Sequence, residues 1–85
     1  MNSSVVETTP LASQVQVTDD ELIVTLVDGR KIAVPLVRFP RLVRATVEQR
    51  GKFELLGDGE GIHWPDVDED VSVEGLLAGR RSRSA

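Results

Sequence analysis

The chain lacks cysteine and tyrosine and contains one tryptophan and one histidine. Without cysteine it can form neither a disulfide nor a zinc-thiolate site, and nothing indicates an oxidising compartment. No apolar run approaches the ~20 residues of a membrane-spanning helix. The first residues lack the basic start and apolar segment of a signal peptide. These absences predict a cytoplasmic protein that makes no contact with a membrane. We also predict no cofactor.

The chain is short enough for its stability to depend on a few large side chains. With 85 residues it forms one domain and buries only about 60–65% of the surface exposed by its unfolded form. Trp64 can bury roughly 150–250 Å². We therefore expect Trp64 to anchor the core, with Pro65 ending the strand that carries it.

The composition divides the chain into three parts. Residues 1–13 are rich in serine and threonine and show no apolar periodicity, so we expect a disordered arm. Residues 14–79 carry all the periodic segments and form a single domain. Residues 80–85 are predicted to be a disordered basic tail.

Alternating apolar residues predict strands in the first half of the domain. Val15 starts such an alternation, and residues 22–27 are apolar on both faces, as in a central strand. Asp28-Gly29 is typical of a two-residue type I′ turn. Residues 30–36 then return as a third strand. Together these segments predict a three-stranded antiparallel meander.

The second half of the domain combines helices with a hairpin. Pro40 suits the first turn of a helix over residues 41–49. Residues 52–56 and 62–64 predict a hairpin, and Ser72 can cap a short C-terminal helix over residues 73–78. The fold class predicted is α+β, with a small antiparallel sheet made of a meander plus a hairpin and with two helices.

The net charge of −4 conceals a polarised distribution of charge. Residues 1–29 contain acids and no base, residues 30–52 contain one acid among many bases, and residues 53–79 again contain acids and no base. Two interpretations remain open. The basic helix and the acidic loop pair within the fold, or they present a surface of both signs to a partner.

Three segments resemble catalytic or metal-binding motifs without completing them. The acids of residues 66–70 resemble the opening of a calcium loop, but Val71 and Leu77 stand where glycine and a bidentate glutamate belong. The glycines of residues 57–61 lack the spacing and the lysine of a phosphate-binding loop. His63 has no nucleophile beside it. We therefore predict no metal site and no catalytic residues, and the chain is not expected to be an enzyme.

The order of several short motifs resembles a bacterial family of unknown function. The motifs are Asp20-Glu21-Leu22, Asp28-Gly29-Arg30, Val34-Pro35-Leu36, Phe39-Pro40, Ala45-Thr46, Gly61-Ile62-His63-Trp64-Pro65, Asp68-Glu69-Asp70-Val71-Ser72-Val73 and Leu76-Leu77. From about residue 15 to residue 79 the chain is similar to the domain-of-unknown-function family numbered 2442. The resemblance implies a small α+β domain with a curved antiparallel sheet and two helices, without established catalytic residues.

The resemblance also implies a protein partner. Members are frequently encoded beside a small protein of the family numbered 4160, and the pair is suspected to form a toxin–antitoxin or similar module. Some relatives carry an added C-terminal helix-turn-helix domain, which this sequence lacks. The implied role is a noncatalytic protein-binding module, antitoxin-like in its most concrete form.

The charged segments around Trp64 provide the predicted partner-binding surface. Its residues are Arg38, Arg41, Arg44, His63, Trp64, Asp66, Asp68 and Glu69. The alternative is a DNA-binding or transcription accessory role based on the basic segment, although the chain is acidic overall and no aromatic residue is interleaved on the basic face of the predicted helix. A homodimer is also open, because the strand from Val15 or the one ending at Pro35 could pair with a second copy.

Overall fold

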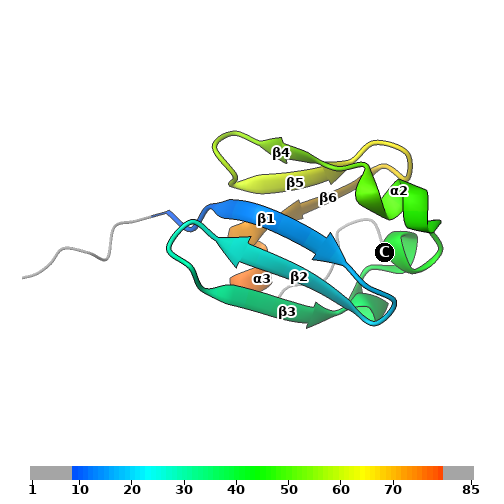
Figure 1. Ribbon diagram of the computed structural model, residues 1–85, viewed down its shortest axis with the longest axis horizontal. Helices are drawn as coiled ribbons and strands as arrows, with labels where there is room; N and C mark the ends of the chain where they lie inside the picture. Colours follow the sequence, from blue (N-terminus) through cyan, green and yellow to red (C-terminus); the bar gives the residue numbers. More distant parts are fainter. Residues whose placement is uncertain (1–8, 80–85) are drawn as a thin grey trace, which may run out of the picture.

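Two three-stranded antiparallel sheets form most of the computed structural model, which describes residues 9–79 (Figure 1). Residues 1–8, which are most of the predicted arm, and the whole predicted tail lie outside the described residues. The first sheet has the order β1-β2-β3 and contains β1 (Ala12–Val17), β2 (Glu21–Leu26) and β3 (Lys31–Pro35). The predicted meander is confirmed. Strand β1 begins at Ala12, two residues before the expected start of the domain, and an irregularity in its pairing follows between Ala12 and Gln14.

The turn between β2 and β3 differs from the predicted one. The Gly29 N–H donates to the Leu26 carbonyl at 2.9 Å, and the Leu26 N–H donates to the Arg30 carbonyl at 2.7 Å. Within residues 9–79, Gly29 has a positive φ of +97° and Asp28 does not, whereas a type I′ turn requires both. The loop therefore spans three residues with glycine in the left-handed position, and the predicted two-residue turn is wrong.

The single helix predicted over residues 41–49 is divided into two short helices. After the 3₁₀ turn η2 (Leu36–Arg38), α1 covers Pro40–Val43 and α2 covers Val47–Gly51. Thr46 interrupts the helix with an extended backbone, and its hydroxyl accepts a hydrogen bond from the Gln49 N–H at 3.0 Å. The Gln49 side chain accepts one from the Thr46 N–H at 2.9 Å. This reciprocal capping satisfies the backbone N–H groups of Thr46 and Gln49 with side-chain oxygens, as at the start of a helix. A second helix therefore begins after Thr46.

The second sheet contains one strand more than expected. Its order is β4 (Glu54–Leu56), β5 (Gly61–Trp64) and β6 (Glu69–Ser72), followed by α3 (Val73–Leu77). The predicted hairpin of β4 and β5 is confirmed, but β6 occupies residues for which the sequence predicts no strand. The Ser72 hydroxyl accepts from the Gly75 N–H at 2.9 Å and caps α3 as expected. Leu77, the last residue of α3, remains 46% exposed.

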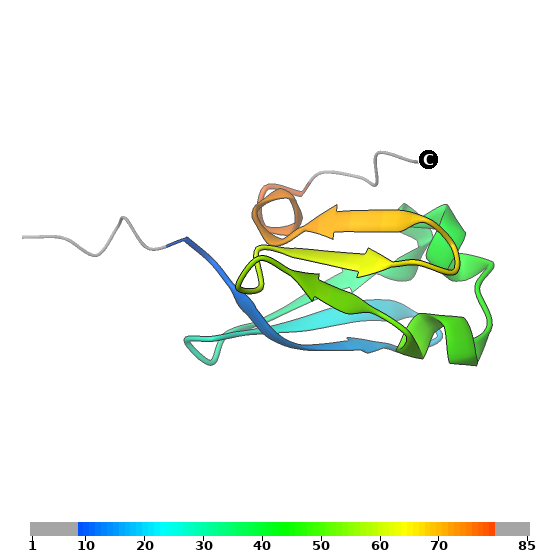
Figure 2. The same ribbon diagram turned by 90° about the horizontal axis from the view of Figure 1, so that it is seen from above.

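The core lies between the two sheets, which Figure 2 shows as two layers with α3 at one end and α1 and α2 at the other. Alternate residues of β2 point into this core, and Ile62 and Trp64 enter it from β5. The Ala12 N–H donates to the Gly59 carbonyl at 2.8 Å and joins the start of β1 to the β4–β5 loop. This arrangement confirms the predicted α+β class. Within residues 9–79, no helix has the length and apolar composition needed to span a membrane.

Candidate functional site

Two residues of the predicted partner-binding surface lie inside the core. The Trp64 side chain is fully buried, its Nε1–H donates to the Arg50 carbonyl at 3.0 Å, and its ring lies 6.3 Å from that of Phe53. Glu69, paired with Trp64 across β5 and β6, is also fully buried. Trp64 is thus the core anchor that its size predicts. Neither residue can contact a partner in this fold, and assigning them to the partner-binding surface was wrong.

The basic segment and the acidic loop between β5 and β6 are in contact through Arg41 and Asp68. Arg41 Nη1–H donates to the Asp68 carbonyl at 2.6 Å and lies 3.6 Å from Asp68 Oδ2. Asp68 is held with a positive φ of 53°, which aspartate tolerates better than most residues. Asp66 Oδ2 lies 4.0 Å from Lys52 Nζ. Ion pairs within the fold therefore engage the charged groups of Arg41, Asp66 and Asp68.

Two other arginines donate hydrogen bonds to backbone carbonyls at or just beyond the ends of helices. Arg38 Nη1–H donates to the Gly79 carbonyl at 2.8 Å, beyond the end of α3. Arg50 donates from Nε to the Leu42 carbonyl at 2.9 Å and from Nη2 to the Val43 carbonyl at 3.0 Å. These carbonyls terminate α1, where cationic groups are favourable. Arg50 was not selected from the sequence, because its partners are set by the break between the helices.

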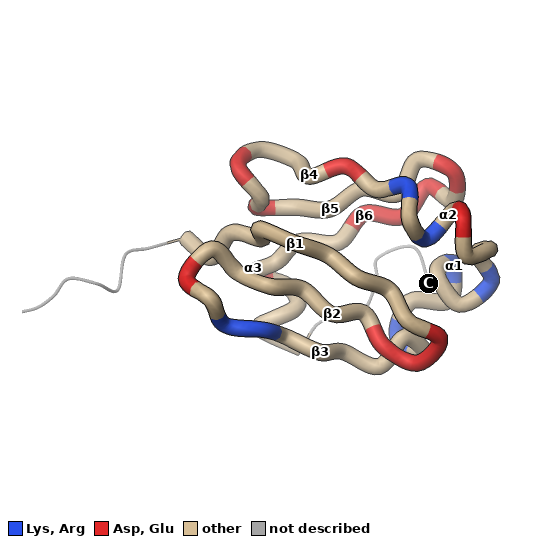
Figure 3. The backbone as a smooth tube through the Cα atoms, viewed as in Figure 1, with Lys and Arg blue, Asp and Glu red and all other residues tan. Residues whose placement is uncertain are grey.

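Arg44 differs from these arginines, because the structure shows no side-chain partner for it among residues 9–79. It lies at the C-terminal end of α1 and is exposed. Val43 beside it is 46% exposed, and Val47 at the start of α2 is 79% exposed. Figure 3 shows basic positions gathered at this end of the molecule. We call Val43, Arg44 and Val47 the helix-break surface.

His63 lies on the outer face of the second sheet, opposite to Ile62 and Trp64. Its Nδ1 is hydrogen-bonded to Asp70 Oδ1 of the neighbouring strand, and Glu54 is its partner in the register on the other side. The hydrogen bond to Asp70 raises the pKa of His63 above its ordinary value, and the charges of Asp70, Glu54 and Asp68 act in the same direction. The site therefore favours the protonated imidazole.

A raised pKa of His63 predicts a specific dependence of stability on pH. The His63–Asp70 contact stabilises the fold fully below the unfolded pKa of about 6.5 and ceases to do so as the pH rises through the raised folded pKa. The difference in urea midpoint between wild type and Asp70→Asn should be largest below the unfolded pKa of about 6.5 and should disappear once the pH exceeds the raised folded pKa. A His63→Gln variant should remove this dependence. A difference that grows toward alkaline pH would contradict the assignment.

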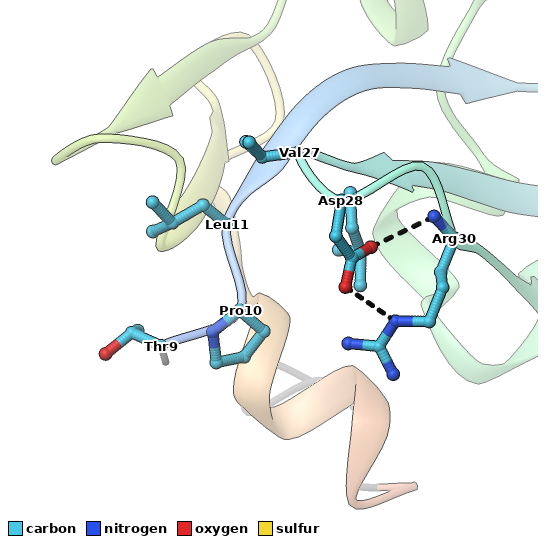
Figure 4. A pocket seen from close by; sticks show the side chains of 7 residues that line it. Thr9, Pro10, Leu11, Val27, Asp28 and Arg30 are labelled. Carbon is cyan, nitrogen blue, oxygen red and sulfur yellow. Dashed lines mark hydrogen bonds and ion pairs between the residues drawn. The ribbon is translucent and has the colours of Figure 1, made fainter. Parts of the chain in front are cut away.

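A groove at the opposite end of the molecule does not involve any predicted site residue (Figure 4). Its lining residues are Thr9, Pro10, Leu11, Leu26, Val27, Asp28 and Arg30. The two charged members are paired with each other, since Arg30 Nε lies 2.8 Å from Asp28 Oδ2. Within residues 9–79, no group of three or more histidine or carboxylate side chains is placed to hold a metal ion. The groove consequently presents no group of obvious chemical function.

A comparison of the chain with protein-family models identifies its family. The family model described as protein of unknown function (DUF2442) matches residues 12–82. This chain belongs to the DUF2442 family. The resemblance inferred from the sequence motifs is thereby confirmed, and the matched segment includes every strand and helix of the structure.

Two solved structures are similar to this DUF2442 protein. A crystal structure of a protein of unknown function from Rhodospirillum rubrum has a TM-score of 0.75 and 33% identity, covering 87% of this chain and 92% of that one. A solution structure of an uncharacterised protein from Chromobacterium violaceum has a TM-score of 0.70 and 29% identity, covering 84% of this chain and 67% of that one. No curated protein matches the chain. None of these descriptions names an activity or a ligand.

Proposed function

We propose that this DUF2442 protein is a cytoplasmic, noncatalytic protein-binding module that docks its partner through the helix-break surface. The observation that carries the proposal is the exposure of Arg44 between two exposed valines, while Arg38, Arg41 and Arg50 donate to backbone carbonyls of the chain itself. Arginine is enriched in protein interfaces, and the fully buried core of an interface is more apolar than the rest of the surface.

The chemistry of this surface suits an acidic partner. A guanidinium group can bind a carboxylate through two parallel hydrogen bonds, and burial beneath a partner strengthens such charged hydrogen bonds. Val43 and Val47 would bury their exposed methyl groups in the same contact. We propose as partner the small protein of the family numbered 4160 that is frequently encoded beside members of this family, and an antitoxin-like role toward it.

Coexpression with the neighbouring protein tests this proposal. We expect a complex whose affinity falls about tenfold or more in Arg44→Glu and in Val47→Asp, because each change places a negative charge against an acidic partner. Matched controls are Arg30→Glu and Val27→Asp, which make the same changes at the opposite end of the molecule. We expect both controls to bind within about twofold of wild type.

The antitoxin-like role adds a growth experiment. The neighbouring protein expressed alone should arrest growth, and coexpression of wild type, but not of Arg44→Glu, should relieve the arrest. A complex without growth arrest would retain the binding function and refute the antitoxin role. Equal weakening by the helix-break variants and their controls would refute the docking surface.

Direct binding of DNA fits this surface less well. Strong association with a duplex requires several cations on phosphates and declines steeply with salt. Three of the arginines in the basic segment are engaged inside the fold, which leaves Arg44 as the free one among Arg38, Arg41, Arg44 and Arg50. Salt-sensitive retention of wild type on duplex DNA, lost in Arg44→Glu, would favour the transcription accessory role instead.

A further inference from the structure

We propose that the outer face of the first sheet is the interface of a homodimer, in which two copies stack face to face with their strands antiparallel. This face is formed by the residues of β1, β2 and β3 that point away from the core. They are Gln14, Gln16, Glu21, Ile23, Thr25, Lys31, Ala33 and Pro35. It is a different surface from the helix-break surface, and the proposal does not depend on the proposed function.

The middle of this face is uncharged and uncovered. Ile23 lies at its centre, with Gln16 opposite it on β1 and Ala33 opposite it on β3. Figure 1 views this sheet from its outer side, and within residues 9–79 no helix or strand lies over it. Ile23 is half-buried at this position, and burial of the rest of its side chain against a second copy would be favourable.

The two ends of the face carry opposite charges. Glu21 begins β2 at one end, and Lys31 begins β3 at the other, where it pairs with Thr25 in the register. Among residues 9–79, the structure shows no hydrogen bond or ion pair made by the side chain of Glu21 or by that of Lys31. The acidic turn before β2 and the basic start of β3 are separated along the sheet in Figure 3.

A two-fold axis across the strands makes these charges complementary. The axis brings Ile23 of one copy over Ile23 of the other and reverses the strand direction between the copies. Glu21 then lies near Lys31 of the second copy, and the symmetry repeats this pair at the opposite end. The face is therefore complementary to itself in charge, and its uncharged centre lies at the axis.

The strand edges suggested by the sequence are less suited to pairing. Strand β3 carries Lys31 at its start and Pro35 at its end, and both residues oppose extension of a sheet. At the start of β1 the pairing is irregular and the Ala12 N–H is already bonded to the Gly59 carbonyl. A face of three short strands is at the low end of stable interfaces, so we expect a dissociation constant of roughly micromolar order.

Sedimentation equilibrium of the chain alone, from about 1 µM to about 1 mM, tests this inference. We expect a monomer–dimer equilibrium that Glu21→Lys and Lys31→Glu each weaken about tenfold, because each reversal turns two attractive pairs into two repulsive ones. The double variant Glu21→Lys with Lys31→Glu should return to within about threefold of wild type. Such rescue distinguishes pairing between copies from a general loss of folding.

A second pair of variants tests the apolar centre. Ile23→Arg should abolish the dimer, whereas Val37→Arg, which changes a valine 76% exposed in η2, should leave it unchanged. A monomer at every concentration, or a dimer that is insensitive to Ile23→Arg and to both charge reversals, would overturn the inference. Because the partner protein is not present, neither result affects the test of the helix-break surface.

Discussion

Trp64→Ala is expected to lower the free energy of unfolding by about 3–5 kcal/mol. The indole is fully buried in the core. Its N–H donates a hydrogen bond to the carbonyl of Arg50, near the end of α2. Truncation would leave a cavity and an unsatisfied carbonyl. A domain of this size has a total stability of about 4–13 kcal/mol, so the variant would be partly or wholly unfolded.

Urea denaturation of two further variants separates the contributions to this effect. Trp64→Phe retains most of the volume but loses the N–H donor, and we expect a cost of about 1–3 kcal/mol. Val47→Ala removes methyl groups that are 79% exposed and should cost less than about 0.5 kcal/mol. If the free energy of unfolding of Trp64→Ala were within about 1 kcal/mol of the wild-type value, the tryptophan would have to be at the surface, and the described core would be wrong.

Gly59→Ala should destabilise the domain by about 3–4 kcal/mol. Gly59 has a φ of +110°, and a Cβ at this position would lie 2.4 Å from the Ala12 carbonyl oxygen and 2.9 Å from its nitrogen. Backbone atoms cannot rotate away as a flexible side chain would. The substitution must therefore break the hydrogen bond from the Ala12 N–H to the Gly59 carbonyl, which joins the two sheets.

Gly29→Ala is the matched control for this prediction. Gly29 also has a positive φ, +97°, but a Cβ there would meet nothing within 4 Å. Its cost should be only the left-handed strain, about 1–2 kcal/mol. Denaturation of both variants by urea measures the difference. Equal costs for the two would show that β1 does not approach the β4–β5 loop as described.

The strands of the first sheet could be predicted because alternation and burial agree there. Leu22, Val24 and Leu26 point into the core, as their spacing indicates. The second sheet was incompletely predicted. In β6 the two inward-facing residues are Glu69 and Val71. Because one of them is a carboxylate, the strand lacks the alternation of apolar and polar residues that would have predicted it. A buried carboxylate depends on contacts within the folded chain, which no local pattern reveals.

The break between α1 and α2 had a signal in the sequence that the apolar periodicity concealed. Thr46 and Gln49 have the spacing of a capping box, which begins a helix. The roles of the arginines could not be predicted in this way. Arg38, Arg41 and Arg50 bind carbonyls whose positions are fixed only after the sheets and helices pack, and only then does Arg44 remain available.

The most direct test of the docking surface is an NMR titration of the isotope-labelled chain with the protein encoded beside it. We predict that the largest amide shift changes occur at Val43, Arg44 and Val47, with little change at Val27 and Arg30 at the opposite end. Saturable changes confined to the helix-break surface would establish it as the docking site. Changes centred elsewhere, or no changes with this protein and clear ones with duplex DNA, would contradict the proposed function.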